Sequence, residues 1–237
     1  MARLKLARAF DRTEVRYSED HWRTLAEVRE RGKAVDEALR RAGVEATFYG
    51  SFARGDVTPA SDVDAFVPHQ VPSFLLENAI ESAGLQVTRR EIVQATPGDL
   101  VKAHVYLPGD ACVTFPLVKP RQLELEFYKF GGALRGPDFS PNRRVPGVNK
   151  RLELIVPTPE GHESFPLKGN EKVAVKLLGV TGKVLEARAR VLGRRDRVGR
   201  TGVFLKQAVA PDQTFEEVLK GLADGNSLVR RRVLGRS

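Results

Sequence analysis

Residues 50–67 constrain this chain more than any other segment, because a Gly-Ser pair ends one short apolar run there and an Asp-Val-Asp triplet begins another. Side chains alternate along a strand, so Asp62 and Asp64 are expected on one face, close enough to share hard divalent cations. Gly50 lets the preceding turn approach a phosphate, and the Ser51 hydroxyl with nearby amides can bind phosphate oxygens. The segment predicts metal-assisted phosphoryl chemistry.

The flanking residues predict an α/β (α+β) domain. Ser18 is a favourable N-cap for a helix, and Gly43 is placed to end that helix. A tight-turn triplet, Pro-Gly-Asp at 108–110, separates two apolar runs as in a hairpin. The expected elements in order are helix 18–42, strands 44–49 and 63–67, helix 72–83, strands 85–93, 101–107 and 111–117, and helix 120–130.

The rest of the chain predicts a connection and a smaller region. Residues 131–149 are rich in Gly, Pro, Asn and Arg, the composition of a linker. Beyond them the pattern predicts a strand at 152–156 and helices at 171–178, 183–192 and 215–223. The predicted organisation is therefore a domain at 1–130, a linker at 131–149 and a basic C-terminal region at 150–237.

Composition narrows the classes of function. The 39 Lys and Arg against 30 Asp and Glu give a net charge of +9 among 237 residues, which favours a polyanionic partner. The single cysteine, Cys112, excludes an internal disulfide and is typical of a reducing compartment. No apolar run approaches the roughly 18 residues that span a bilayer. We expect a cytoplasmic protein without a membrane partner.

Several features together resemble the DNA polymerase β-type nucleotidyltransferase superfamily. Besides the Gly-Ser pair and the Asp-x-Asp triplet, the chain has Ala-Arg-Gly at 53–55, Ser61 ahead of the aspartates and an apolar strand behind them. The resemblance is to the small archaeal-type minimal members and to the catalytic domain of CCA-adding enzymes, and it extends by element order over about residues 18–130. It implies a mixed sheet with flanking helices.

The resemblance also implies roles for individual residues. Gly50 and Ser51 would hold the phosphates of a nucleoside triphosphate, and Asp62 and Asp64 would coordinate two Mg²⁺ or Mn²⁺ ions. Arg54 would add positive charge near the phosphates, although an ordinary ion pair with its neighbour Asp56 is an equal alternative. The implied reaction moves a nucleoside monophosphate onto a hydroxyl acceptor.

The chain departs from the family at the third catalytic carboxylate, which usually lies on a later strand facing the Asp-x-Asp pair. The corresponding strand, 111–116, contains no acidic residue. Asp110 stands in the turn before it, Glu124 and Glu126 lie in the next predicted helix, and Glu153 lies on a later strand. Either another acid completes the site, or the fold serves as an RNA-binding or regulatory module without transfer.

The acceptor and the oligomeric state remain open in the sequence. RNA such as tRNA, a protein hydroxyl and a small molecule are all compatible with the resemblance, and the positive charge favours RNA. The C-terminal basic residues have two alternative interpretations. They could form a solvated helix face, or they could belong to a DNA-binding helix-turn-helix whose turn is the glycine turn at 179–182. These residues are Arg188, Arg190, Arg194, Arg195, Arg197, Arg200, Arg230, Arg231, Arg232 and Arg236.

Overall fold

The computed structural model describes residues 12–199 and 202–235. Its helices are α1 (Glu19–Arg41), α2 (Ser51–Arg54), α3 (Ser73–Ser82), α4 (Gln122–Phe130), α5 (Glu171–Leu178), α6 (Gly182–Val198), α7 (Phe215–Gly225) and α8 (Ser227–Val233). Its strands are β1 (Thr13–Arg16), β2 (Thr47–Tyr49), β3 (Val63–Phe66), β4 (Arg89–Gln94), β5 (Lys102–Leu107), β6 (Ala111–Pro116), β7 (Ala133–Leu134), β8 (Gly147–Val148), β9 (Glu153–Thr158), β10 (Gly161–Pro166) and β11 (Leu205–Ala208).

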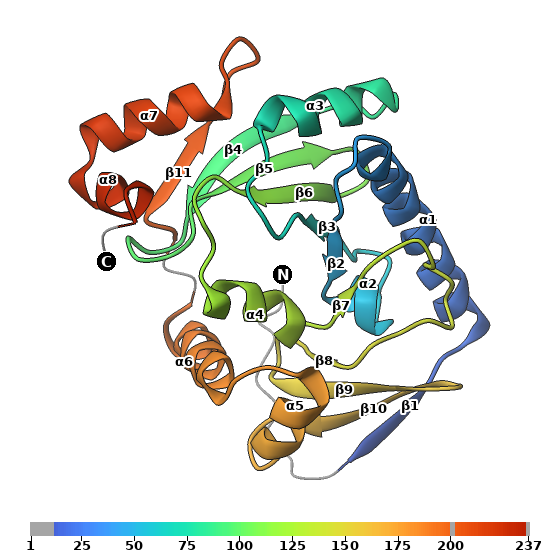
Figure 1. The fold of residues 1–237 in the computed structure, drawn as a ribbon. Coiled ribbons are helices and arrows are strands. Elements are labelled where there is room, and N and C mark those ends of the chain that lie inside the picture. The colour runs from blue at the N-terminus through green and yellow to red at the C-terminus, as the bar shows by residue number, and fades with distance from the viewer. Residues whose placement is uncertain (1–11, 200–201, 236–237) are drawn as a thin grey trace.

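The larger sheet has seven strands in the order β11-β4-β5-β6-β3-β2-β7. Strands β3 and β6 are parallel, and the other neighbours are antiparallel. This mixed sheet with flanking helices confirms the predicted fold class. It also places β3, the strand of the aspartates, between the Gly-Ser strand β2 on one side and the β5–β6 hairpin on the other (Figure 1).

Helices cover the two faces of this sheet differently. On one face Phe48 contacts Phe52 of α2, and Phe115 contacts Phe215 of α7. Helices α1 and α3 lie along that same side (Figure 1). On the other face Phe66 stacks on Tyr128 of α4 at a ring-centroid distance of 3.6 Å. Because side chains alternate along β3, the face that carries Phe66 is also the face of Asp64.

A second, four-stranded sheet has the order β1-β10-β9-β8. It packs with α5 and α6 around a separate small core that includes Leu154, Ala174 and Val184. Phe130 at the end of α4 joins this core. The second sheet is thereby fixed to the helix that covers the aspartate face of the first.

Strand pairing crosses the ranges predicted for the domain, linker and C-terminal region. β1 comes from the N-terminal range but pairs with β10, and β11 comes from the C-terminal range but pairs with β4. The linker range contributes β7 to the larger sheet and β8 to the smaller one. The division of the chain at 131–149 therefore stays a prediction. The strand pairings β1–β10 and β11–β4 nevertheless connect the predicted domain with the predicted C-terminal region.

The main predicted helices and strands form close to their expected bounds. Ser18 caps α1 by accepting a hydrogen bond from the His21 amide, and Gly43 follows the helix at a φ of 74°. The pattern did not predict α2, α8, β1, β7, β8, β10 or β11, and α6 runs six residues past the expected end at 192. Within residues 12–199 and 202–235, none of the helices combines the length and apolar character that crossing a bilayer requires.

Close packing under α2 depends on a glycine in the middle of α1. A Cβ on Gly32 would come within 2.3 Å of a ring carbon of Phe52. The guanidinium of Arg29, one turn earlier, lies 4.6 Å from the centre of the same ring and donates to the carbonyl of Arg143. Absence of a side chain at Gly32 thus lets α1 support the short helix that follows the Gly-Ser turn.

We predict that Gly32→Ala destabilises the protein, although alanine favours a helix more than glycine does. Overpacking typically costs about 1–3 kcal/mol, more than the ~1 kcal/mol that helix propensity returns. Gly193→Ala in α6 is the matched control, since no atom lies within 4 Å of its added Cβ. Chemical denaturation should show a lower unfolding free energy for Gly32→Ala and an equal or higher one for Gly193→Ala. Equal stabilisation by both would contradict the packing argument.

Candidate active site

The Gly-Ser pair forms the entrance to α2, directly after β2. Gly50 has a φ of 77° and a ψ of −145°, a conformation that side-chain-bearing residues rarely adopt. Its amide donates to the carbonyl of Gly132 at 3.1 Å, which fixes the turn against the loop after α4. Ser51 therefore stands at the first position of a one-turn helix rather than in an open loop.

A loop brings the end of the Gly-Ser turn to the start of the aspartate strand. Ser51 Oγ donates to Ser61 Oγ at 3.3 Å, and Ser61 Oγ also accepts from the Thr58 amide at 2.8 Å. Arg31 of α1 donates to the carbonyl of Ser61 and to that of Gly109 in the β5–β6 turn. Because Ser61 directly precedes Asp62, these contacts hold the two motifs of the sequence next to each other.

The two aspartates differ in exposure. Asp62 is exposed just before β3, whereas Asp64 within β3 is half-buried. Burial, followed by the charge of Asp62, raises the pKa of Asp64 to about 6. Lys150 and Lys102 oppose that increase in the pKa. A raised pKa is expected where a carboxyl group is partly withdrawn from water beside a second carboxylate.

Arg54 lies under the turn and is buried. Its guanidinium donates to the carbonyl of Gly131 at 2.6 Å and pairs with the carboxylate of Asp56 at 2.9 Å. The ion pair between Arg54 and Asp56, one of the two roles that the sequence allowed for Arg54, is therefore present. A contact between Arg54 and nucleotide phosphates stays a prediction.

The strand expected to carry a third carboxylate carries none. Cys112 of β6 is in register with Asp64, and Thr114 follows on the same face. The hydroxyl of Thr114 lies 3.0 Å from Nδ1 of His104 on the neighbouring strand β5. Burial lowers the pKa of His104 to about 3 and raises that of Cys112 to about 12, so both groups are neutral near pH 7.

The other acids considered for that role have partners elsewhere. Glu124 pairs with Arg232, Glu126 accepts hydrogen bonds from Thr181, and Glu153 accepts one from the Asn149 side chain. Asp110 is a turn residue with a φ of 55°. In the described part of the chain, no three His, Cys, Asp or Glu residues are grouped so that they could hold a metal ion.

The donor set nevertheless fits one kind of metal site. Mg²⁺ is usually held by one or two carboxylates together with substrate phosphates and water, rather than by a complete protein cage. Asp62 and Asp64 supply such a pair, and a cation would stabilise the carboxylate of Asp64, which burial and then the charge of Asp62 disfavour. The arrangement suits a cation that arrives with a nucleotide.

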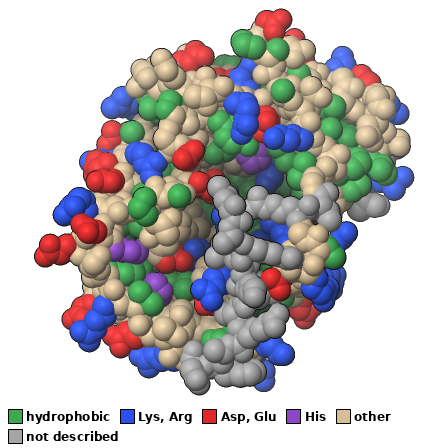
Figure 2. Space-filling view, turned by 180° about the vertical axis from the view of Figure 1, so that it is seen from behind, with side chains coloured by type: hydrophobic (Ala, Val, Ile, Leu, Met, Phe, Trp, Pro, Cys, Tyr) green, Lys and Arg blue, Asp and Glu red, His purple; other side chains and the backbone are tan. Residues whose placement is uncertain are grey.

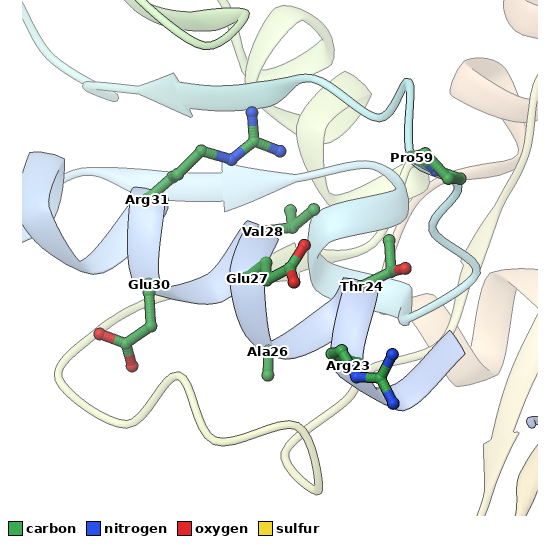
Figure 3. Close-up of a pocket in the computed structure, with 8 residues that line it drawn as sticks. All are labelled: Arg23, Thr24, Ala26, Glu27, Val28, Glu30, Arg31 and Pro59. Carbon is green, nitrogen blue, oxygen red and sulfur yellow. The ribbon is translucent and has the colours of Figure 1, made fainter. Parts of the chain in front are cut away.

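A surface hollow of about 720 Å³ lies away from these aspartates. It opens between the outer side of α1 and the loop at Pro59, and its lining includes Arg23, Glu27 and Arg31 (Figure 3). Gly50, Ser51, Asp62 and Asp64 do not line it. The hollow is therefore not formed by the predicted site residues.

Sequence reasoning missed three basic residues near the site, and one of them, Lys150, opposes the rise in the pKa of Asp64. Arg31 braces the loop before Asp62, and no local pattern distinguishes it from the other exposed residues of an amphipathic helix. Lys102 could have been found from the alternation in residues 102–107, which puts it on the same face as His104 and Tyr106. Burial lowers its pKa, and the charges of Asp99, Cys112 and Asp64 oppose that decrease in the pKa.

We predict that Asp64→Asn stabilises the metal-free protein at pH 8. The folded pKa lies above the ordinary value of 3.8, so the folded state binds the proton more tightly and loses stability as pH rises from about 4 to 6. Removing this charge should raise the unfolding free energy by up to about 3 kcal/mol at pH 8, because the pKa rises from 3.8 to about 6 and each unit of pKa corresponds to ~1.4 kcal/mol. Denaturation in EDTA measures the effect.

The stabilisation should disappear near pH 4, where Asp64 is protonated in the folded wild type. Asp62→Asn is the control, because Asp62 is exposed and should change the stability less. A stability gain for Asp64→Asn that is the same at pH 4 and pH 8 would exclude the desolvated charge as its cause.

Comparison with known families gives an independent identification. Residues 28–105 match the family model described as a nucleotidyltransferase domain. The match runs from α1 through β5 and includes the Gly-Ser turn and both aspartates. A comparison with curated proteins finds no match. The segment that builds this site is thus a nucleotidyltransferase domain of the polymerase β-like type.

Proposed function

We propose that the chain transfers a nucleoside monophosphate from a nucleoside triphosphate to a hydroxyl of an RNA acceptor. The observation that carries this proposal is the contact between Ser51 and Ser61, because it puts a phosphate-binding type of turn beside a pair of metal-binding carboxylates. Phosphoryl transfer requires little more from a protein than such positioning and charge stabilisation.

Each residue of the pair of motifs has a part in the proposed reaction. Gly50 and Ser51 bind the phosphates that leave as pyrophosphate. Asp62 and Asp64 hold the divalent cation, Mg²⁺ or Mn²⁺, which when bound neutralises the triphosphate and favours the deprotonated acceptor hydroxyl. The bond from the acceptor oxygen to the α-phosphorus forms, the bond to pyrophosphate breaks, and the hydroxyl proton passes to solvent.

RNA is preferred over a protein acceptor because of the basic surface. Arg190, Arg194 and Arg197 of α6 and Arg231 of α8 are exposed. Arg188 and Arg232 instead pack against the protein, on Phe127 and on Glu124 respectively. Arg230 is exposed, and its guanidinium donates to the Ala223 carbonyl at the end of α7. Arg200 and Arg236 lie outside the described residues. Phosphate contacts by the exposed arginines would release counterions and make binding depend on salt.

A second candidate is a nucleotidyltransferase fold that binds nucleotide or RNA without transfer. It is favoured by one observation, the neutral Cys112 and Thr114 where a third carboxylate would face Asp64. Among the described residues only Asp62 and Asp64 are placed for this role, and two carboxylates provide less negative charge for a second cation. Substrate phosphates must then supply the remaining ligands of that second cation.

We predict that the wild-type chain transfers label from an α-labelled triphosphate to RNA and that Asp62→Asn and Asp64→Asn each abolish the transfer. Metal ions supply several kcal/mol of charge stabilisation, so the loss should be at least about a hundredfold. The assay compares ATP, CTP, GTP and UTP with Mg²⁺ or Mn²⁺ and total cellular RNA or protein, and gel separation identifies the labelled acceptor.

Asp212→Asn is the matched control, since Asp212 is exposed far from the site in sequence and loses the same charge. Retained transfer in both site variants would contradict the assignment of the metal-binding residues. Label on protein rather than RNA would replace the proposed acceptor. Nucleotide binding without transfer in the wild type would favour the second candidate.

A further inference from the structure

A straight row of side chains leads from the aspartates across the larger sheet. Asp64 is in register with Cys112, Cys112 with Tyr106, and Tyr106 with Arg89. All four lie on the same face, because residues paired across strands point the same way. Three strand spacings of about 4.8 Å separate the ends of the row, a distance of ~14 Å.

The far end of the row is a stacked pair. The guanidinium carbon of Arg89 lies 4.0 Å from the centre of the Tyr106 ring. Half of the Arg89 side chain, 53%, is exposed, so the guanidinium is accessible on top of the ring. Guanidinium planes and aromatic rings are the groups on which proteins stack unpaired nucleobases.

Positive charge accompanies this pair along the sheet. Lys206 of β11 and Arg89 both contact the carboxylate of Glu91, at 3.3 and 3.4 Å, so two cations share one buried anion. Lys102 lies on the same face, in line with Lys206 through Val93. In the part of the chain that the structure describes, the Lys102 ammonium has no hydrogen-bond or ion-pair partner. The face carries an excess of positive charge.

Basic side chains also gather on one face of the molecule. Figure 2 shows some of them, with a histidine, at the upper edge of a hollow in that face. Helices α1, α3 and α7 lie behind the sheet, and α4 covers the aspartate face near β2, β3 and β7. Within the described residues, β4 and β5 thus present Arg89 and Tyr106 outward.

The order of strands in the larger sheet indicates which substrate would lie over the row from Asp64 to Arg89. The Gly-Ser turn lies beyond β2, on one side of β3, whereas Arg89 and Tyr106 lie beyond β6, on the other side. In phosphoryl transfer the attacking and leaving oxygens are roughly in line on opposite sides of the phosphorus. If the triphosphate tail lies over the Gly-Ser turn, the attacking hydroxyl comes from the side of β6, β5 and β4.

We propose that the Arg89–Tyr106 pair is a stacking platform for a base of a single-stranded RNA acceptor a few nucleotides before its reacting end, with Lys206 and Lys102 contacting its phosphates. This inference rests on the proposed function for the direction of the strand. The platform binds by stacking and charge, so it tolerates different bases.

Fluorescence anisotropy with a labelled 12-nucleotide single-stranded RNA tests the platform directly. We expect Arg89→Lys to weaken binding about tenfold, because it keeps the charge beside Glu91 but loses the stacking plane, at ~1–3 kcal/mol per stacked base. Tyr106→Leu should weaken it similarly. Lys206→Gln should lower the slope of log affinity against log salt by about 0.7, the value for one phosphate contact on a single strand.

The variant Lys33→Gln is the charge-matched control for Lys206→Gln, since Lys33 is exposed on α1 behind the sheet. It should bind RNA like the wild type. Equal weakening by the control, or unchanged RNA affinity in both Arg89→Lys and Tyr106→Leu with normal unfolding curves, would overturn the platform.

Transfer assays separate this inference from the proposed function. If wild-type protein binds RNA through the platform but transfers no label, the proposed function fails and the platform stands. If it transfers label to RNA and Arg89→Lys leaves the KM for RNA unchanged, the platform fails and the proposed function stands. The expected result is a KM for RNA raised about tenfold with kcat nearly unchanged.

Discussion

The hydroxyl contact between Ser51 and Ser61 is the constraint on which the arrangement of the site depends. Ten residues separate the two serines in sequence, and their contact determines where the turn ends and where the aspartate strand begins. The contact is weak by itself, since a neutral hydrogen bond contributes only about 1 kcal/mol. It is maintained by stronger neighbours: the buried pair of Arg54 and Asp56 on one side and the Arg31 brace on the other.

Two features of the site, the partly buried Asp64 and the backbone conformation of Gly50, reduce the stability of the domain or restrict its sequence. Asp64 is held as a partly buried acid beside a second acid, and Gly50 has a backbone conformation that glycine adopts but residues with side chains rarely do. Close packing compensates for the buried acid on the opposite face, where Gly32 lets Phe52 lie against α1. A desolvated acid at the site and tight packing behind it are therefore parts of one arrangement.

Local patterns predicted the central elements and the principal motifs, but not the sheet edges. Helix α1 has a cap, a stop glycine and helical periodicity, so its bounds were predictable. The sequence of β11, Leu-Lys-Gln-Ala, has no strand alternation, and it becomes extended by pairing with β4. The sequence also could not predict the partners of Arg54, because Asp56 and a phosphate would both attract its guanidinium. Only the fold brings the carbonyl of Gly131 next to that guanidinium. The candidate site residues could therefore be proposed from the sequence. The contacts of Arg54 and Arg31 that hold the turn and the loop in place could be found only in the structure.

The position of β11 has a consequence for synthesis on the ribosome. Strand β4 has β5 on one side from early in translation, but its other neighbour is encoded more than a hundred residues later. Until residues 205–208 leave the exit tunnel, the backbone amides and carbonyls of β4 stay open to any extended segment nearby, and such free edges promote aggregation. The nascent chain thus gains its finished border only after β11 has been synthesised, and chaperone binding in that interval would protect the strand that carries Arg89.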